Sequence, residues 1–450
     1  MKINRIDLYY VKLPLEEKRP GFFSDPAYFT PSWIPGFRQS EMRFYLLCLG
    51  TDQGHEGYAT MPAMGFERKG LGPLLGNYLM GINPLDIRLV NQRIQEFSYI
   101  GMRNGWIDAA FWDIIGKARG EPLWQVLGGT GGFVYPYLSS GSHHNHDQEM
   151  ARKITLRALE DGYKGVKLRV KSAELAPMVD YVGAARDAAG DSLNLMVDAN
   201  QGWPVDLFDE TPKWNLEFAQ AFAQSIEQYH IKWLEEPLNR GDFDGLAELR
   251  RGTETPIAGG EINSSWRDFK AMLDTGSLDI YQPDAVLAGG TYAGGISVVY
   301  WLIREIQSRN QQNSATPALK YCPHTWTTGL GFAVALQLVG VLPAHERSLL
   351  EFPLEGHWKP EYWARFIKGG FTSDQEGRIE IPEAPGLGVQ IDWDIIRRFG
   401  KRIYHGTAAR VAANTLLDRG LRQTLYLKNK KNAQLERTAQ AHFAIPEPPF

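Results

Sequence analysis

The chain has 450 residues, 43% of them apolar, and a net charge of −4, values that are ordinary for a folded protein of two domains. The small negative charge gives no reason to expect nucleic acid as a partner. No charge-free apolar run is long enough to span a bilayer, so we expect no membrane partner. The first residues lack the apolar core of a signal peptide, and two cysteines in so long a chain fit a reducing compartment. We therefore expect a cytoplasmic protein.

The N-terminal part has the pattern of an α+β domain. Residues 1–60 contain alternating runs typical of antiparallel strands, and helical spacing follows to about residue 127. Between the first two strands lies a loop, residues 20–40, that is rich in Pro, Gly and aromatic residues. Loops of this length in compact domains are usually functional or disordered, and the aromatic content argues against disorder. We expect a capping domain at residues 1–130.

Residues 131–355 alternate strand and helix patterns. Eight short apolar runs bounded by turn signals are typical of buried parallel strands; they lie at 134–138, 165–169, 193–198, 231–235, 256–261, 278–284, 319–324 and 348–352. Eight such units predict an α/β fold, a modified TIM (β/α) barrel, with the α+β capping domain N-terminal to it.

The C-terminal part has a different composition. We expect residues 356–400 to return to the capping domain. Residues 401–450 carry nine Lys or Arg against three acids. This pattern predicts a basic, partly helical tail that packs on a neighbouring subunit of a homo-oligomer rather than one with a binding role of its own.

Three consecutive strands end on a carboxylate: Asp198, Glu235 and Glu261. The C-terminal ends of barrel strands converge on one mouth, where enzymes of this architecture place their working groups. Like charges held that close together require a cation. Oxygen ligands suit a hard divalent ion, so the sequence predicts a Mg²⁺ site.

Other strand ends add further polar groups to the same mouth. Lys167 and Arg169 are two residues apart on one strand, so both point the same way. Asp284 and His324 end adjacent strands and could hydrogen-bond, which would fix the imidazole tautomer and raise its basicity. A metal, a His base with an orienting Asp, and a cationic pair opposite suit the abstraction of a proton next to a carboxylate. Glu351 ends the eighth strand.

The sequence resembles the mandelate racemase subgroup of the enolase superfamily over about residues 1–400. Seven motifs carry the resemblance, in chain order: Ile107-Asp-Ala-Ala-Phe-Trp-Asp-Ile-Ile-Gly-Lys, Val197-Asp-Ala-Asn-Gln-Gly-Trp, Trp233-Leu-Glu-Glu-Pro-Leu, Gln282-Pro-Asp-Ala, Cys322-Pro-His-Thr-Trp, Leu350-Glu-Phe-Pro and Pro385-Gly-Leu-Gly-Val. The resemblance implies that the N-terminal domain caps the barrel. The loops at residues 20–40 and about 59–68 would then close over the barrel and select the substrate.

The resemblance also implies residue roles. Asp198, Glu235 and Glu261 would bind Mg²⁺, with Glu235 rather than the adjacent Glu236 as the ligand. We expect Glu236 to be structural, or at most to support the ligands.

By the same resemblance, His324 would be the general base and Asp284 its hydrogen-bonding partner. Glu351 matches the acid that hydrogen-bonds to the substrate carboxylate or protonates it.

One position departs from the family pattern. The second strand of the family commonly carries Lys-x-Lys, whose second lysine is a base opposite the histidine, whereas this chain has Lys167-Leu-Arg169. Arginine stays protonated and is a poor base. A racemase needs bases on both faces of the α-carbon, whereas dehydration needs one base and an acid for the leaving hydroxyl, and His324 could serve as both. An alternative base is Lys167 with a pKa lowered by the Arg169 cation.

We therefore expect a magnesium-dependent sugar-acid dehydratase that produces a 2-keto-3-deoxy acid from a small-molecule carboxylate substrate. The alternatives are a racemase or epimerase of a 2-hydroxy acid, or a catalytically idle metal-binding scaffold. The residues leave the substrate and its stereochemistry open.

Several other residues are weaker candidates. Asn200 shares a strand face with Asp198 and could support it or contact the substrate. Trp33, Phe37 and Arg38 in the long loop could contact the substrate, with Arg38 clamping a distal carboxylate or hydroxyl, or could pack on the barrel rim. A solvated loop is expected for the histidine cluster at 143–146, and a core position for Cys322.

Overall fold

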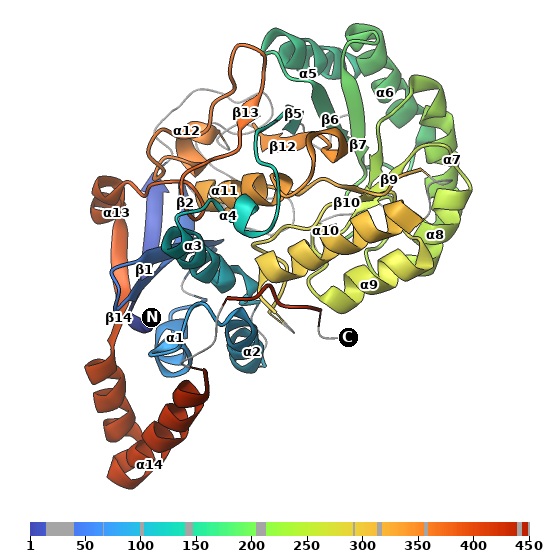
Figure 1. Ribbon diagram of the computed structural model, residues 1–450. Helices are drawn as coiled ribbons and strands as arrows, with labels where there is room; N and C mark the ends of the chain where they lie inside the picture. Colours follow the sequence, from blue (N-terminus) through green and yellow to red (C-terminus); the bar gives the residue numbers. More distant parts are fainter. Residues whose placement is uncertain are drawn as a thin grey trace.

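The protein has two main sheets, an antiparallel one and a parallel one, in the computed structural model shown in Figure 1. The structure describes residues 1–14, 40–65, 67–99, 103–139, 147–203, 213–290, 293–312, 317–354, 359–438 and 443–448. Within these ranges no helix is both long and apolar enough to cross a membrane.

The capping domain is built on a four-stranded antiparallel sheet in the order β14-β1-β2-β3. Its strands are β1 (Ile3–Pro14), β2 (Glu41–Thr51), β3 (Glu56–Pro62) and β14 (Gly400–Thr407). The helices that follow β3 are α1 (Leu71–Leu79), α2 (Ile87–Ser98), the 3₁₀ turn η1 (Gly105–Ile107), α3 (Asp108–Arg119) and α4 (Leu123–Val126). Because β14 pairs with β1, the chain returns to the capping sheet at residues 400–407. The composition had predicted that this segment belongs to the basic tail.

The second sheet has eight parallel strands, as the sequence predicted. In chain order they are β5 (Pro136–Ser139), β6 (Gly165–Arg169), β7 (Asn194–Asp198), β8 (Leu234–Glu235), β9 (Ile257–Gly259), β10 (Ile280–Tyr281), β11 (Lys320–Tyr321) and β12 (Leu350–Pro353). Each strand from β5 to β10 pairs with the strand that follows it, and β12 pairs with β5, so the sheet curls around its interior. The expectation of a (β/α) barrel is confirmed.

Helices surround the curled sheet (Figure 1). They are α5 (Gln148–Glu160), α6 (Leu175–Ala189), α7 (Leu216–Ile226), η2 (Glu227–Tyr229), α8 (Phe243–Arg251), α9 (Trp266–Thr275), α10 (Gly295–Gln312), α11 (Gly329–Val339) and η3 (Ala344–Glu346). Side-chain caps begin several of them; Asp147, Asn215, Asp242, Ser265 and Thr328 each accept a backbone N–H in the first turn.

The barrel interior explains why the strand ends carry the chemistry. Alternate strand residues point inward, and a buried apolar layer fills the middle of the barrel with Tyr137, Met196, Trp233, Ala258, Ile280 and Cys322. Two residues beyond Met196 and Trp233, the inward positions are Asp198 on β7 and Glu235 on β8, which are in register with each other. Arg169 on β6 is in register with Asp198 on its other side. The polar groups therefore form a layer directly above an apolar floor, where solvent screens their charges poorly.

The capping domain is joined to the barrel by buried polar contacts. The carboxylate of Asp108, at the start of α3, accepts hydrogen bonds from the backbone N–H groups of Ile296 and Ser297 in the first turn of α10. The hydroxyls of Thr60 in β3 and Thr328 at the start of α11 hydrogen-bond to each other. These contacts hold the capping domain against the barrel.

After the barrel the chain returns to the capping domain before it ends. The elements are α12 (Pro360–Trp363), β13 (Ile379–Glu380), which pairs with β4 (Phe133–Val134), α13 (Trp393–Phe399), β14 and the long α14 (Ala408–Thr438). Trp301 of α10 donates a hydrogen bond from Nε1 to the carbonyl of Pro446, which holds the last described residues against the barrel.

Candidate active site

Lys167 occupies the centre of the carboxylate cluster. Its Nζ lies 2.6 Å from Glu235 Oε1, 2.8 Å from Glu351 Oε1 and 3.5 Å from Asp198 Oδ2, and all four side chains are at most 1% exposed. Burial by itself lowers the pKa of Lys167, but the carboxylates around it raise that pKa well above its usual value. This direction is opposite to the lowered pKa that a Lys167 base would need.

Glu351 is hydrogen-bonded at both oxygens. Its Oε1 accepts from Ser139 Oγ (2.8 Å) and Trp326 Nε1 (3.1 Å), and its Oε2 accepts from the backbone N–H of Thr325 (2.9 Å). Although burial raises the pKa of Glu351, the charges of Lys167 and His324 and the hydrogen bonds from Lys167 and the Thr325 N–H bring it down to about 2. In this structure Glu351 is an ionised carboxylate that holds Lys167 in place.

His324 and Asp284 form the expected pair. His324 Nδ1 lies 2.9 Å from Asp284 Oδ2, and the other carboxylate oxygen of Asp284 accepts from the backbone N–H of Val286. His324 Nε2 faces Glu261 Oε2 at 3.5 Å. Burial lowers the pKa of His324, but the charge of Glu261 and the hydrogen bond to Asp284 raise it to about 10. A cation that neutralised Glu261 would remove the largest of the effects that raise this pKa.

Arg169 lies on β6, between the cluster and an aromatic ring. Its guanidinium stacks over Trp326 at 5.0 Å, its Nη2 donates to Ser139 Oγ at 3.4 Å, and its Nε lies 3.8 Å from Asp198 Oδ2. Arg169 thus faces the cluster as a permanent cation held by three partners.

Glu235, the last residue of β8, and the adjacent Glu236 have different environments. Glu235 accepts hydrogen bonds from Trp233 Nε1 (3.1 Å) and Gln282 Nε2 (2.8 Å) in addition to Lys167. Glu236 has a left-handed backbone, with φ of 47°, and both of its carboxylate oxygens are buried without a hydrogen-bond partner among the described residues. Burial and the charges of Glu261, Asp198 and Glu235 raise the pKa of Glu236 well above its usual value.

The residues fit a divalent cation by charge and donor type. Among the strand-end residues that the structure describes, six buried carboxylates face two permanent cations, Lys167 and Arg169; the carboxylates belong to Asp198, Glu235, Glu236, Glu261, Asp284 and Glu351. Burial and mutual repulsion raise the pKa values of Asp198, Glu235 and Glu261. A hard cation would relieve this excess of negative charge.

The three expected ligands do not surround one point, however. In the described part of the chain no three His, Cys, Asp or Glu side chains are placed to hold one ion. Glu235 Oε1 lies 2.6 Å from Lys167 Nζ, so the ammonium competes with a metal ion for this oxygen. Binding through Glu235 would require this ion pair to loosen. The assignment of the three ligands stays a prediction that the charge balance supports.

The other predicted residues divide between described and undescribed parts of the chain. Asn200 is in a left-handed conformation, with φ of 46°; its backbone N–H donates to Asp198 Oδ1 at 2.9 Å, and its side-chain Oδ1 is buried without a partner among the described residues. Cys322 is a core residue and, like Cys48, has a free thiol. Trp33, Phe37, Arg38 and the histidines at 143–146 lie outside the described residues.

Four residues around the site had no role in the sequence-based prediction: Trp203, Gln282, Trp326 and Ser139. Trp203 Nε1 donates to Glu261 Oε1 at 2.7 Å, which makes it the counterpart of Trp326 at Glu351 and Gln282 at Glu235. Trp203, Gln282 and Trp326 belong to motifs that carry the family resemblance, and this position in the motifs could have indicated a role in the site. Ser139 had no such signal, because it ends a strand with no other polar residue.

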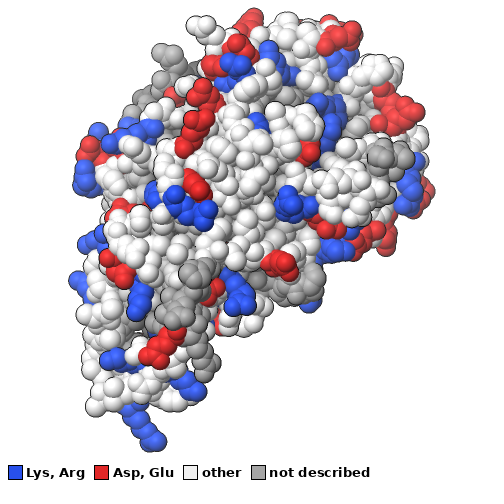
Figure 2. Space-filling view, in the orientation of Figure 1, with Lys and Arg blue, Asp and Glu red and all other residues white. Residues whose placement is uncertain are grey.

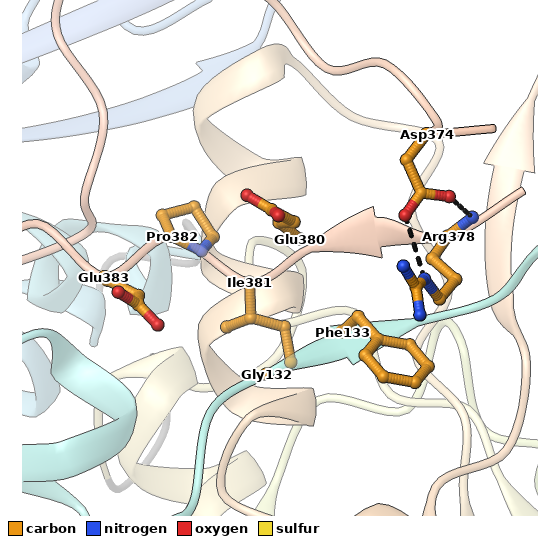
Figure 3. A pocket seen from close by; sticks show the side chains of 8 residues that line it. All are labelled: Gly132, Phe133, Asp374, Arg378, Glu380, Ile381, Pro382 and Glu383. Atoms are coloured by element: carbon orange, nitrogen blue, oxygen red, sulfur yellow. Dashed lines mark hydrogen bonds and ion pairs between the residues drawn. The ribbon is translucent and has the colours of Figure 1, made fainter. Parts of the chain in front are cut away.

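A surface pocket lies elsewhere on the barrel. Its volume is about 400 Å³, and it is lined by Gly132, Phe133, Asp374, Arg378, Glu380, Ile381, Pro382 and Glu383. Figure 3 shows Arg378 bonded to Asp374; its guanidinium also stacks on Phe133. The pocket adjoins β4 and β13, before the first barrel strand begins, and none of the predicted site residues lines it. We assign it no part in the chemistry.

Comparison with known proteins identifies relatives that cover most of the chain. The Enolase C-terminal domain-like family matches residues 149–296 and 313–395. The L-talarate/galactarate dehydratase of Salmonella typhimurium strain LT2 is 32% identical over 341 residues, which are 73% of this chain and 76% of that protein. The N-succinyl-L-Arg/Lys racemase of Bacillus cereus is 26% identical over 304 residues, 65% of this chain and 74% of the racemase.

The solved structures show the same fold. The L-talarate dehydratase of Polaromonas sp. JS666, solved with magnesium and L-glucarate, has a TM-score of 0.67 at 21% identity, and the match covers 90% of this chain and 99% of that one. The curated relatives include further sugar-acid dehydratases at 25 to 26% identity. Dehydratases and racemases thus both occur among the relatives.

Proposed function

The chain belongs to the Enolase C-terminal domain-like family, within the enolase superfamily, and on that premise we propose that it is a magnesium-dependent dehydratase of a sugar acid. The enzyme would remove the α-proton of the substrate carboxylate and eliminate the β-hydroxyl as water, which gives a 2-keto-3-deoxy acid. The sugar-acid substrate class is supported by the dehydratases among the relatives.

The proposal rests on His324 as a single base whose imidazole is held in one orientation. His324 is held by Asp284 through Nδ1, which leaves Nε2 directed towards the cluster. On the other side stand Arg169, which stays charged, and Lys167, which is bonded to two carboxylates. Racemisation needs a base on each face of the α-carbon, whereas dehydration needs one, and the raised pKa of Lys167 and the permanent charge of Arg169 support the assignment of His324 as that one base.

His324 would act twice. Neutral His324 takes the α-proton on Nε2, while Asp284 accepts the hydrogen bond from Nδ1–H and stabilises the imidazolium. The electron pair of the broken C–H bond forms the enediolate, which expels the β-hydroxyl. His324 gives its proton to that hydroxyl, so that water leaves and the resulting enol tautomerises to the 2-keto acid. In this proposal the Lys167 and Arg169 cations would stabilise the negative charge that develops on the substrate carboxylate.

A magnesium ion held by Asp198, Glu235 and Glu261 would neutralise Glu261, so that His324 can be a neutral base, and would stabilise the enediolate charge. Magnesium in the Polaromonas dehydratase supports this choice of ion.

The test is a screen of the purified protein with Mg²⁺ in D₂O against a library of sugar acids, with 2-keto product and α-carbon deuterium both followed. We expect keto product from one stereochemical class of acid. The His324→Asn variant should lose turnover while it keeps its magnesium-induced thermal shift. His345→Asn is the matched control, because the His345 side chain is 81% exposed and lies outside the cluster.

The outcomes separate the candidate functions. An epimer that carries α-deuterium, formed without keto product, would mean that the enzyme is a racemase or epimerase and that Lys167 or Arg169 is a second base. Full turnover by His324→Asn would disprove the assigned base. Magnesium binding without turnover of any acid in the library would favour the idle scaffold.

A further inference from the structure

The helix α14 projects from the capping domain as a hairpin. Its residue Gly420 has non-helical angles, with φ of 74° and ψ of 169°, and the two arms spread from this point in a V (Figure 1). The hairpin lies beyond the family match, which ends at residue 395. The Polaromonas structure is matched over 99% of its own length but only 90% of this chain.

One face of the hairpin is attached to the capping domain by polar contacts. The hydroxyl of Thr415 donates to Asn77 Oδ1, and Lys431 Nζ donates to the carbonyl of Asn77 at 3.0 Å. Arg93 of α2 donates to the side chain of Gln434. Both arms are thus tied to the body of the protein.

The rest of the hairpin surface exposes apolar side chains around the turn and along both arms. Six of the nine exposed large apolar residues in the described part of the chain belong to α14: Leu416, Leu417, Leu421, Leu425, Tyr426 and Leu427. Leu417 is 83% exposed and Leu421 is 64% exposed, and they flank the turn. None of the described side chains of α14 is buried. Helical arms of this length are marginally stable in water, so a partner that covers this apolar surface would stabilise the hairpin.

Charge selects the partner. Residues 408–438 carry seven Lys or Arg and two acids, a net charge of +5, and because the whole chain has −4, the remainder carries −9. Figure 2 shows Lys and Arg side chains separated by uncharged surface on the hairpin at the lower left. Two hairpins packed on each other would bring together two charges of +5. A hairpin on the body of a second copy joins opposite signs.

We propose that the apolar face of this hairpin, residues 416–427, docks onto the acidic body of a second copy of the chain, with Leu417 and Leu421 as its anchors. The contact is reciprocal in a two-fold dimer, because each copy supplies one hairpin and one body. The proposal concerns assembly and does not depend on the reaction that the barrel catalyses.

The test is sedimentation velocity on the full chain across a concentration series. The double variant Leu417→Gln/Leu421→Gln should associate at least about tenfold more weakly than the wild type. Leu156→Gln is the matched control, because Leu156 on α5 is 47% exposed and should leave association unchanged. The variant Arg419→Gln/Arg422→Gln lowers the positive charge of the hairpin and should also weaken association.

Three results would overturn the proposal. Association unchanged in the leucine double variant would exclude this face as the contact. Tighter association of the arginine double variant would mean that hairpins pack on each other. A monomeric wild type that floats with phosphatidylserine-containing vesicles, when the leucine double variant does not, would make an anionic membrane the partner.

Discussion

Replacing Lys167 with Met should destabilise the metal-free protein strongly, because it removes the cation that the carboxylates share. The ammonium makes contacts of 2.6 Å and 2.8 Å to Glu235 and Glu351 in a setting that is at most 1% exposed. Removing one partner of a buried pair costs about 3 to 5 kcal/mol. We expect the lower end of that range, because Ser139, Trp326 and Gln282 continue to hydrogen-bond the two carboxylates.

The same variant should bind magnesium more tightly. Lys167 competes with any cation for Glu235, so its removal should lower the Kd for Mg²⁺ about tenfold, which corresponds to about 1.4 kcal/mol. Denaturant unfolding in EDTA measures the loss of stability, and calorimetric titration with Mg²⁺ measures the affinity.

Lys232→Met is the matched control for this experiment. Lys232 is half-buried and hydrogen-bonds to Asn194 Oδ1, and it forms no ion pair with the residues that the structure describes. Its replacement should lower the free energy of unfolding only slightly and leave the affinity for Mg²⁺ unchanged. The idea that Lys167 compensates the negative charge of the carboxylate cluster would be refuted by either of two results. One is a decrease in the free energy of unfolding below about 1 kcal/mol for Lys167→Met in EDTA, and the other is equal effects of the two variants.

Two further predictions follow from the site and the hairpin. Asp284→Asn should reduce kcat about 100-fold with the fold intact, because an amide can present a donor to His324 Nδ1 and favour the wrong tautomer; an unchanged kcat would exclude the pairing. Partial burial, and to a lesser extent the charge of Arg93, lowers the pKa of Lys431 to about 8. The folded state therefore binds this proton less well than the unfolded state, and the stability that this group contributes rises as pH increases from about 8 to about 10. Lys431→Met should therefore be more stable than the wild type at neutral pH, with a difference that shrinks towards about pH 10 in denaturant unfolding; a difference independent of pH would contradict this reasoning.

The sequence predicted most of what local patterns can determine. Short apolar runs that end on Asp198, Glu235 and Glu261 indicated both the barrel strands and the residues at its mouth, because strand ends in a barrel have a common direction. The Asp284–His324 contact followed from the adjacency of two strands. Both predictions rest on periodicity and chain order, which a single sequence contains.

Two features depended on information that local patterns lack. The direction of the Lys167 side chain is set by the balance of buried carboxylates on several different strands, and no single strand contains that balance. The difference between Glu235 and Glu236 depends on a left-handed backbone at Glu236, which an ordinary glutamate does not signal. The strand β14 was missed for a similar reason, because its partner β1 lies at the opposite end of the chain.

The pairing of β1 with β14 has a consequence for biosynthesis. Arg5 is in register with Thr407, and Val11 with Gly400, so the capping sheet cannot be completed until the ribosome has made nearly the whole chain. Contacts this distant in sequence slow folding, and the barrel strands between them can form first. The nascent capping domain would meanwhile expose one edge of β1 to other chains. A chaperone that shields the N-terminal segment during translation should therefore raise the yield of folded enzyme more than one that acts after release.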